Sequence, residues 1–179
     1  MLLTIDRDGS IGAVNNHRPT RPEGIMSDEL PRYFPLGEGK SYQLGRITLT
    51  FKTSATDTRS AYTLCEAVEP PDAGAGLHCH LSYDETHIIC EGRYEARLGN
   101  KTLQLSAGDM FFAPRGTPHS IKCLGPEIGR ELMISSPGGV FDAFIDEVVS
   151  SMTASGSPTG GPAVDFRAIA AKYGIEFLS

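Results

Sequence analysis

The stretch GLHCHLSYDETHIICEGRYEARL, residues 76–98, combines a strand-like alternation with three of the chain's five histidines. Its last part, residues 93–98, alternates cleanly. Tyr94, Ala96 and Leu98 fall on one face of an extended chain, and three charged residues fall on the other. This period of two predicts a half-buried β-strand, because successive side chains of a strand point to opposite sides.

Short segments of the same kind recur on both sides of this stretch, separated by turns rich in Gly, Pro, Asn and Asp. We expect strands at residues 46–52, 61–68, 77–80, 85–91, 93–98, 102–105, 110–113, 119–123 and 130–135. Many short strands at close, regular spacing are typical of an all-β sandwich or barrel. Because the sequence shows no internal repeat, we expect one barrel over residues 41–136.

The two ends of the chain differ from this pattern. Residues 1–40 are rich in Pro, Gly, Asn and Arg without a clear period, which predicts an irregular N-terminal arm. Residues 137–179 are expected to form a C-terminal helical extension. Within it, VFDAFIDEVVSSM (140–152) has the period of an amphipathic helix, residues 154–162 have the composition of a flexible linker, and a second short helix ends at Gly174.

The composition excludes several classes of function. The net charge of −6 and the pI of about 5.3 disfavour binding to a phosphate backbone, so we expect no nucleic-acid partner. The chain has no apolar run of about 18 residues and no secretory signal, so we expect no membrane partner and a cytoplasmic location. The four cysteines form no CxxC pair, which favours free thiols, although a disulfide between two of them stays open.

The histidines suggest a metal site. In a strand, His78 and His80 point to the same face with Cα atoms roughly 6.6 Å apart, so both imidazoles can reach one ion. Glu85 follows after a short connection, and His119 begins a later predicted strand. Three imidazoles and one carboxylate suit Fe, Mn, Ni, Co, Cu or Zn. A hydrogen-bonded pair of histidines without an ion is the alternative, and the concentration of ligand types within residues 78–119 favours the metal.

The chain resembles the cupins, small β-barrel proteins with two motifs, G(x)5HxH(x)3-4E(x)6G and G(x)5PxG(x)2H(x)3N. The matching residues are His78, His80, Glu85 and Gly92 for the first motif, and Gly108, Pro114, Gly116 and His119 for the second. Asp72 replaces the first glycine and Cys123 the final asparagine. The resemblance covers about residues 45–136, and the arrangement is similar to single-domain cupins of the quercetin-dioxygenase-like group.

This resemblance implies a cupin jelly-roll barrel (a double-stranded β-helix) with an irregular N-terminal arm and two C-terminal helices. It also implies one divalent transition metal held inside the barrel by His78, His80, Glu85 and His119. Asp84 is the neighbouring alternative to Glu85, because the pleat of a strand cannot turn both inward. The spacing from the glutamate to Gly92 favours Glu85.

The roles of His87 and of four candidate pocket residues have more than one interpretation. His87 shares the inner face with Glu85. It is either a buried neutral histidine bonded to a neighbour or an acid/base group that supports a metal ligand or faces the substrate. Met110, Phe112, Ile121 and Cys123 are candidate walls of a substrate pocket. Ordinary core is an equal alternative for Met110, Phe112 and Ile121, and a nucleophilic thiol is the alternative for Cys123.

By this resemblance we expect a metal-dependent dioxygenase that uses Glu85 and His87 as catalytic residues and takes O2 and a small enolisable or flavonol-like molecule as substrates. A non-redox isomerase, lyase or cyclase with the same ligands is the alternative, as is a small-molecule-binding protein without turnover. A homodimer is expected by analogy with other cupins. The substrate, the native metal and the role of the N-terminal arm are not determined by the sequence.

Overall fold

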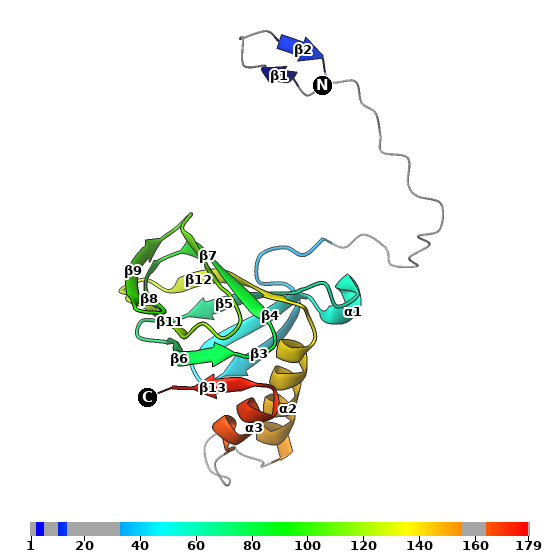
Figure 1. The fold of residues 1–179 in the computed structure, drawn as a ribbon, viewed down its shortest axis with the longest axis vertical. Helices are drawn as coiled ribbons and strands as arrows, with labels where there is room; N and C mark the ends of the chain where they lie inside the picture. The colour runs from blue at the N-terminus through cyan, green and yellow to red at the C-terminus, as the bar shows by residue number, and fades with distance from the viewer. Residues whose placement is uncertain (1–2, 6–10, 14–32, 155–163, 179) are drawn as a thin grey trace, which may run out of the picture. The chain divides into compact units, whose positions relative to one another are not determined.

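The computed structural model describes residues 3–5, 11–13, 33–154 and 164–178 (Figure 1). The chain divides into two units, Met1–Arg32 and Tyr33–Ser179. In the first unit, β1 (Leu3–Ile5) pairs antiparallel with β2 (Ile11–Ala13). Most of the predicted irregular arm, and most of the predicted linker at 154–162, lie outside the described residues.

The second unit is built on two antiparallel sheets, which confirms the all-β prediction. The six-stranded sheet contains, in spatial order, β10 (Met110–Ala113), β7 (Asp84–Glu91), β12 (Gly129–Ser136), β5 (Thr63–Glu69), β4 (Ile47–Thr53) and β3 (Lys40–Leu44). The five-stranded sheet contains, in spatial order, β13 (Ile175–Phe177), β6 (Gly74–His80), β11 (His119–Cys123), β8 (Arg93–Leu98) and β9 (Lys101–Ser106).

Each strand predicted from the alternation is present within a few residues of its expected ends. Five elements were not predicted: β1 and β2 in the arm that was expected to be irregular, then β3, β13 and the short helix α1 (Ala55–Thr58). β3 pairs with β4, and β13 pairs with β6. Each sheet therefore has one edge strand that lies outside residues 46–135, the part of the chain in which strands were predicted. The borders between arm, barrel and extension stay a prediction.

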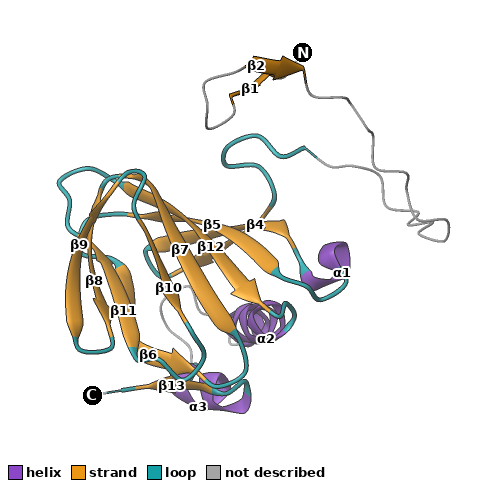
Figure 2. Cartoon of the chain, turned by 45° about the horizontal axis from the view of Figure 1, so that its top comes forward, coloured by secondary structure: helices purple, strands orange, loops and turns teal. Residues whose placement is uncertain are grey.

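Both predicted C-terminal helices are present as α2 (Val140–Ala154) and α3 (Phe166–Lys172), beside the barrel (Figure 2). The apolar face of α2 is buried, and it packs in one core cluster with Leu49 and Phe51 of β4. Its buried residues are Phe141, Phe144, Ile145 and Val148. The side chain of Asp165 caps the start of α3 by accepting a hydrogen bond from the backbone N–H of Ala168. No helix of the described residues is long and apolar enough to cross a membrane.

One turn departs from the expected sequence but keeps its shape. Asp72 has φ of +64°, in the left-handed region that a glycine adopts easily. Aspartate is one of the few other residues that tolerate this region. The replacement of the first motif glycine by Asp72 is therefore compatible with the tight turn that leads into β6.

Gly129, at the start of β12, leaves room for Tyr94 of β8, which crosses the space between the two sheets. A Cβ atom added at Gly129 would overlap the ring and the hydroxyl of Tyr94. Tyr94 is fully buried among Ile89, Phe111 and Cys123, so its ring has little room to move. The glycine is thus required by packing between the sheets.

We therefore expect Gly129→Ala to lower the free energy of unfolding by about 1–3 kcal/mol, as overpacking of a filled core does. Gly76→Ala is the matched control, because a Cβ at Gly76 meets nothing within 4 Å. Urea denaturation of both variants measures the difference. Equal stability of the two variants would contradict this account of Gly129.

Candidate metal centre

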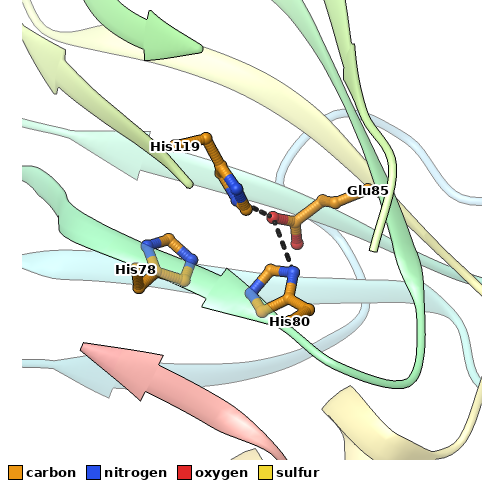
Figure 3. A group of neighbouring side chains, drawn as sticks. All are labelled: His78, His80, Glu85 and His119. Atoms are coloured by element: carbon orange, nitrogen blue, oxygen red, sulfur yellow. Dashed lines mark hydrogen bonds and ion pairs between the residues drawn. The ribbon is translucent and has the colours of Figure 1, made fainter. Parts of the chain in front are cut away.

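Four buried side chains from three strands converge inside the barrel (Figure 3). His78 and His80 come from β6, Glu85 from β7 and His119 from β11. One ligand atom from each lies within 4.8 Å of the ligand atoms of the other three. The pairing of β6 with β11 places His78 directly opposite His119, and the turn between β6 and β7 brings Glu85 to the same point.

The imidazoles are held in orientations that suit an ion. The Nδ1 atoms of His78 and His119 donate to the backbone carbonyls of Gly76 and Thr117, at 2.7 and 2.9 Å. In His78 this leaves the lone pair of Nε2 available, an arrangement common among histidines that bind metals. The Nε2 atom of His119 lies 3.1 Å from Glu85 Oε2, within hydrogen-bond distance. The Nδ1 atom of His80 lies 3.6 Å from Glu85 Oε2 and has no hydrogen-bond partner among the residues described.

The electrostatics also fit a metal. Burial is the main reason why the pKa of His78 falls to about 4 and that of His80 to about 3, so both rings are neutral at pH 7. Burial alone would raise the pKa of Glu85, but the charge of His87 and hydrogen bonds from His119 and His87 hold it well below its usual value. Neutral imidazoles and a carboxylate are the ligand forms that a borderline divalent ion requires.

The structure decides between the two neighbouring acids. Glu85 points to the cluster, whereas the Asp84 carboxylate forms a two-pronged ion pair with Arg115, with N–O distances of 3.0 Å. These contacts lower the pKa of Asp84 to about 2. The preference for Glu85, which rested on its spacing to Gly92, therefore agrees with the side-chain directions.

His87 lies between two carboxylates. Its Nε2 atom is 3.1 Å from Glu85 Oε2, and its Nδ1 atom is 2.8 Å from Glu131 Oε2. Burial alone would lower the pKa of His87, but the two carboxylates outweigh it and raise the pKa well above its usual value. His87 is thus buried and bonded, as the first alternative expected, and the direction of its pKa shift favours the charged ring over the neutral one. His87 also contacts a predicted metal ligand, as the second alternative required.

Of the four predicted pocket residues, only Ile121 lines the cavity that adjoins the cluster. Met110 and Phe112 are 54% and 50% exposed, so their assignment to the pocket was wrong: in β10 the inward residues are Phe111 and Ala113. Cys123 is fully buried in the core around Tyr94 and does not line the cavity. All four cysteines are free.

The cavity measures about 330 Å³ and has two chemically different parts. Residues of β4, α2 and β13 make an apolar wall, which includes Leu49, Phe141, Ile145, Val148 and Phe177. Phe177 also stacks on His78, with ring centroids 5.5 Å apart. The remaining wall carries three residues of the cluster, His78, His80 and Glu85, together with Tyr83, His87, Glu69 and Glu131.

Sequence reasoning missed Tyr83, Glu69 and Glu131. Tyr83 has no exposed surface, and its ring stacks on His80 with centroids 4.1 Å apart. Tyr83 lies in LSYD, a short connection between two predicted strands, and connections are usually exposed, so its burial was not predicted. The alternation of β12 does put Glu131 on the same face as Met133 and Ser135, but a glutamate in a strand normally predicts the face turned to solvent.

Comparison with known proteins agrees with this geometry. Residues 66–135 match the family model described as cupin domain. An uncharacterized protein of Methanocaldococcus jannaschii is 35% identical over 63 residues, which cover 35% of this chain and 50% of that protein. The chain therefore spans about half the length of this curated relative.

Similar solved structures include KdgF from Halomonas sp., with a TM-score of 0.54, 21% identity, and coverage of 60% of this chain and 96% of that one. A predicted oxalate decarboxylase from Thermotoga maritima has a TM-score of 0.56, 19% identity, and coverage of 59% and 99%. The fold is thus the predicted cupin jelly roll, and these findings together support the cupin superfamily. Similarity to the quercetin-dioxygenase-like group stays a prediction.

If the cluster binds a metal, Glu85→Gln and His119→Ala should each lower the metal content of the purified chain, because each removes one of four donors. Asp84→Asn is the matched control, since Asp84 pairs with Arg115 outside the cluster. Elemental analysis after dialysis measures the metal bound per chain. Full metal content in His119→Ala would contradict the assignment of His119 as a ligand.

Glu69 leads to a second prediction, on pH. Burial, followed by the charge of Glu131, raises its pKa from 4.5 to about 8. Between these values the folded chain binds a proton that the unfolded chain has lost, so the free energy of unfolding falls as pH rises, by up to about 1.4 kcal/mol per pH unit. Glu69→Gln should remove this slope. Urea denaturation from about pH 5 to about pH 8 tests it, and an unchanged slope would contradict it.

Proposed function

We propose that this chain is a metal-dependent enzyme that moves protons on a small organic substrate, as an isomerase or lyase does. The observation that carries this proposal is the buried chain of acid and base groups next to the metal cluster. Glu85 is at once a candidate ligand and the partner of His87, and His87 is bonded in turn to Glu131. Such a chain supplies groups that both remove and return a proton.

The residues fit a divalent ion by their donor set, by the carbonyls that orient His78 and His119, and by the unpaired Nδ1 atom of His80. When bound by His78, His80, Glu85 and His119, such an ion supplies Lewis acidity that polarises a carbonyl or hydroxyl oxygen of the substrate.

The protein groups divide the remaining work. The imidazolium of His87 stabilises the Glu85 carboxylate, which accepts the proton from the substrate carbon. His87 donates its Nε2 proton to the product, and the proton on Glu85 then passes to His87, which restores both groups. Tyr83 faces the cavity, and its hydroxyl has no hydrogen-bond partner in the described part of the chain, so it donates to a substrate oxygen. The apolar wall of α2 and β13 keeps water away from these groups.

Dioxygenation, the reaction first predicted from the sequence, is the second candidate. The apolar wall of the cavity favours it, because this wall suits a flavonol-like ring and molecular oxygen. The two structural neighbours do not decide between the candidates, since their names differ and an identity near 20% supports the fold alone. The His87–Glu131 pair favours proton transfer, because dioxygenation requires only removal of a proton, whereas an isomerase or a lyase must also deliver one to the product.

The test uses the full chain loaded with Zn, Mn, Fe, Co or Ni, with acetylacetone and a flavonol as enolisable probes. Exchange of carbon-bound hydrogen in deuterium oxide is followed by NMR, and oxygen uptake with an electrode. We expect exchange that depends on the metal and proceeds without oxygen. Tyr83→Phe should slow it by about a hundredfold, as the loss of one preorganised donor does. Tyr62→Phe is the control, because Tyr62 is 39% exposed and outside the cavity.

Metal-dependent oxygen uptake would instead support the dioxygenase. If the chain binds metal but catalyses neither reaction with these probes, the proposal of proton transfer on enolisable substrates is wrong. A small-molecule-binding protein without turnover is then the better description.

A further inference from the structure

We propose that the cavity contains a second binding site, formed by Glu69 and Glu131, that takes an O–H or N–H donor group of the ligand. This deepens the proposed function, because the same small molecule would meet the metal cluster with one polar group and the two glutamates with another. The site is separate from the four-residue cluster and uses different strands.

Glu69 and Glu131 lie side by side on the inner face of the six-stranded sheet. In the register of β5 and β12, Glu69 is opposite Gly129 and Glu131 is opposite Ala67, so the two glutamates are diagonal neighbours. Their exposed fractions are 2% and 0%, and both line the cavity. Two carboxyl groups have thus been placed where a protein core normally has apolar side chains.

One oxygen of each carboxyl group has no hydrogen-bond partner within the described ranges. Glu131 Oε2 is bonded to His87 Nδ1, which leaves Glu131 Oε1 as a buried acceptor without a donor. Glu69 Oε2 also lacks a partner, and because its raised pKa keeps a proton on Glu69 below about pH 8, this carboxyl group can both accept and donate. A ligand without a donor leaves Glu131 Oε1 unpaired, which is unfavourable, whereas a hydroxyl or an amine can donate to it.

The position of the two glutamates fits a ligand with two polar ends. A single imidazole ring, that of His87, separates Glu131 from Glu85 of the metal cluster. A molecule that binds at the cluster can therefore reach Glu131 with a group a few bonds away, while its apolar part faces Leu49, Phe141 and Ile145. Water can fill the site in the free protein, and a ligand donor that replaces this water keeps its hydrogen bonds.

Such a site rejects ligands that lack the donor. A methyl group in place of a hydroxyl would displace the water and leave the buried polar atoms of Glu69 and Glu131 unpaired, and unpaired buried groups discriminate strongly against a ligand that lacks the donor. Binding of matched small aromatic probes therefore tests the proposal directly and needs neither turnover nor the natural substrate.

The probes are toluene, benzyl alcohol and benzylamine, which have similar size and differ in the donor group. Dissociation constants for the full chain are measured by NMR titration. We expect benzyl alcohol, benzylamine or both to bind at least about tenfold more tightly than toluene, the size of effect that one hydrogen bond to a buried carboxylate gives. The ranking of the alcohol and the amine identifies which donor the site prefers. Equal binding of all three, or no saturable binding of any, overturns the proposal.

Variants locate the source of the preference. Glu69→Met keeps most of the side-chain volume without the oxygens, and Glu131→Gln keeps the shape without the charge. Each should reduce the preference over toluene several-fold, and Glu95→Gln on the exposed face of β8 should not. Thermal melting of each variant checks that it is folded. A preference that survives both Glu69→Met and Glu131→Gln arises elsewhere and contradicts the proposal.

The metal cluster is tested apart from this site by His119→Ala, which removes a ligand and leaves both glutamates in place. If the alcohol or amine preference survives in His119→Ala, the glutamate site acts without the metal. If the chain fails the catalytic test but still prefers benzyl alcohol or benzylamine over toluene, the proposed function is wrong and the binding site is supported. If the chain is catalytic but shows no such preference, the binding site is wrong and the proposed function is supported.

Discussion

The fully buried carboxylate of Glu85 is the constraint on which the rest of the site depends. A carboxylate without water is highly unfavourable unless donors or cations surround it. Glu85 Oε2 lies 3.1 Å from both His119 Nε2 and His87 Nε2, and 3.6 Å from His80 Nδ1. These contacts tie β7 to β6 and β11 of the opposite sheet, so the same group that prepares a site for an ion also joins the two halves of the barrel.

Glu131, the second carboxylate near His87, is a main reason why the pKa of this histidine is raised. Glu131 lies on β12, which is hydrogen-bonded to β7 in the six-stranded sheet. His87 forms a hydrogen bond with Glu131 through Nδ1 and with Glu85 through Nε2. A buried imidazolium between two carboxylates leaves one net negative charge in this part of the core, and a divalent ion would offset it. The chain of groups therefore fits a metal-loaded barrel better than an apolar one, and this holds whichever reaction the protein performs.

The sequence predicted the convergence of the four residues from one local rule and one resemblance. A period of two put His78 and His80 on one face, and the match to the cupin motifs added Glu85 and His119. The same local rule failed for β10, since Met110 to Ala113 are all apolar and alternation cannot show which of them faces inward. The charge of His87 depends on Glu131, which lies 44 residues later in the chain, so no local pattern contains it. Tyr83 was missed because nothing in a short connection predicts that its ring is buried against His80.

The pairing of β13 with β6 links the C-terminal segment to the imidazoles themselves. Ile175 pairs with His80 and Phe177 with His78, on the same strand that carries both rings. Phe177 also stacks on the ring of His78, so β13 covers part of the candidate metal centre. Loss of the last few residues of the described chain would therefore uncover two of the candidate ligands without removing either of them.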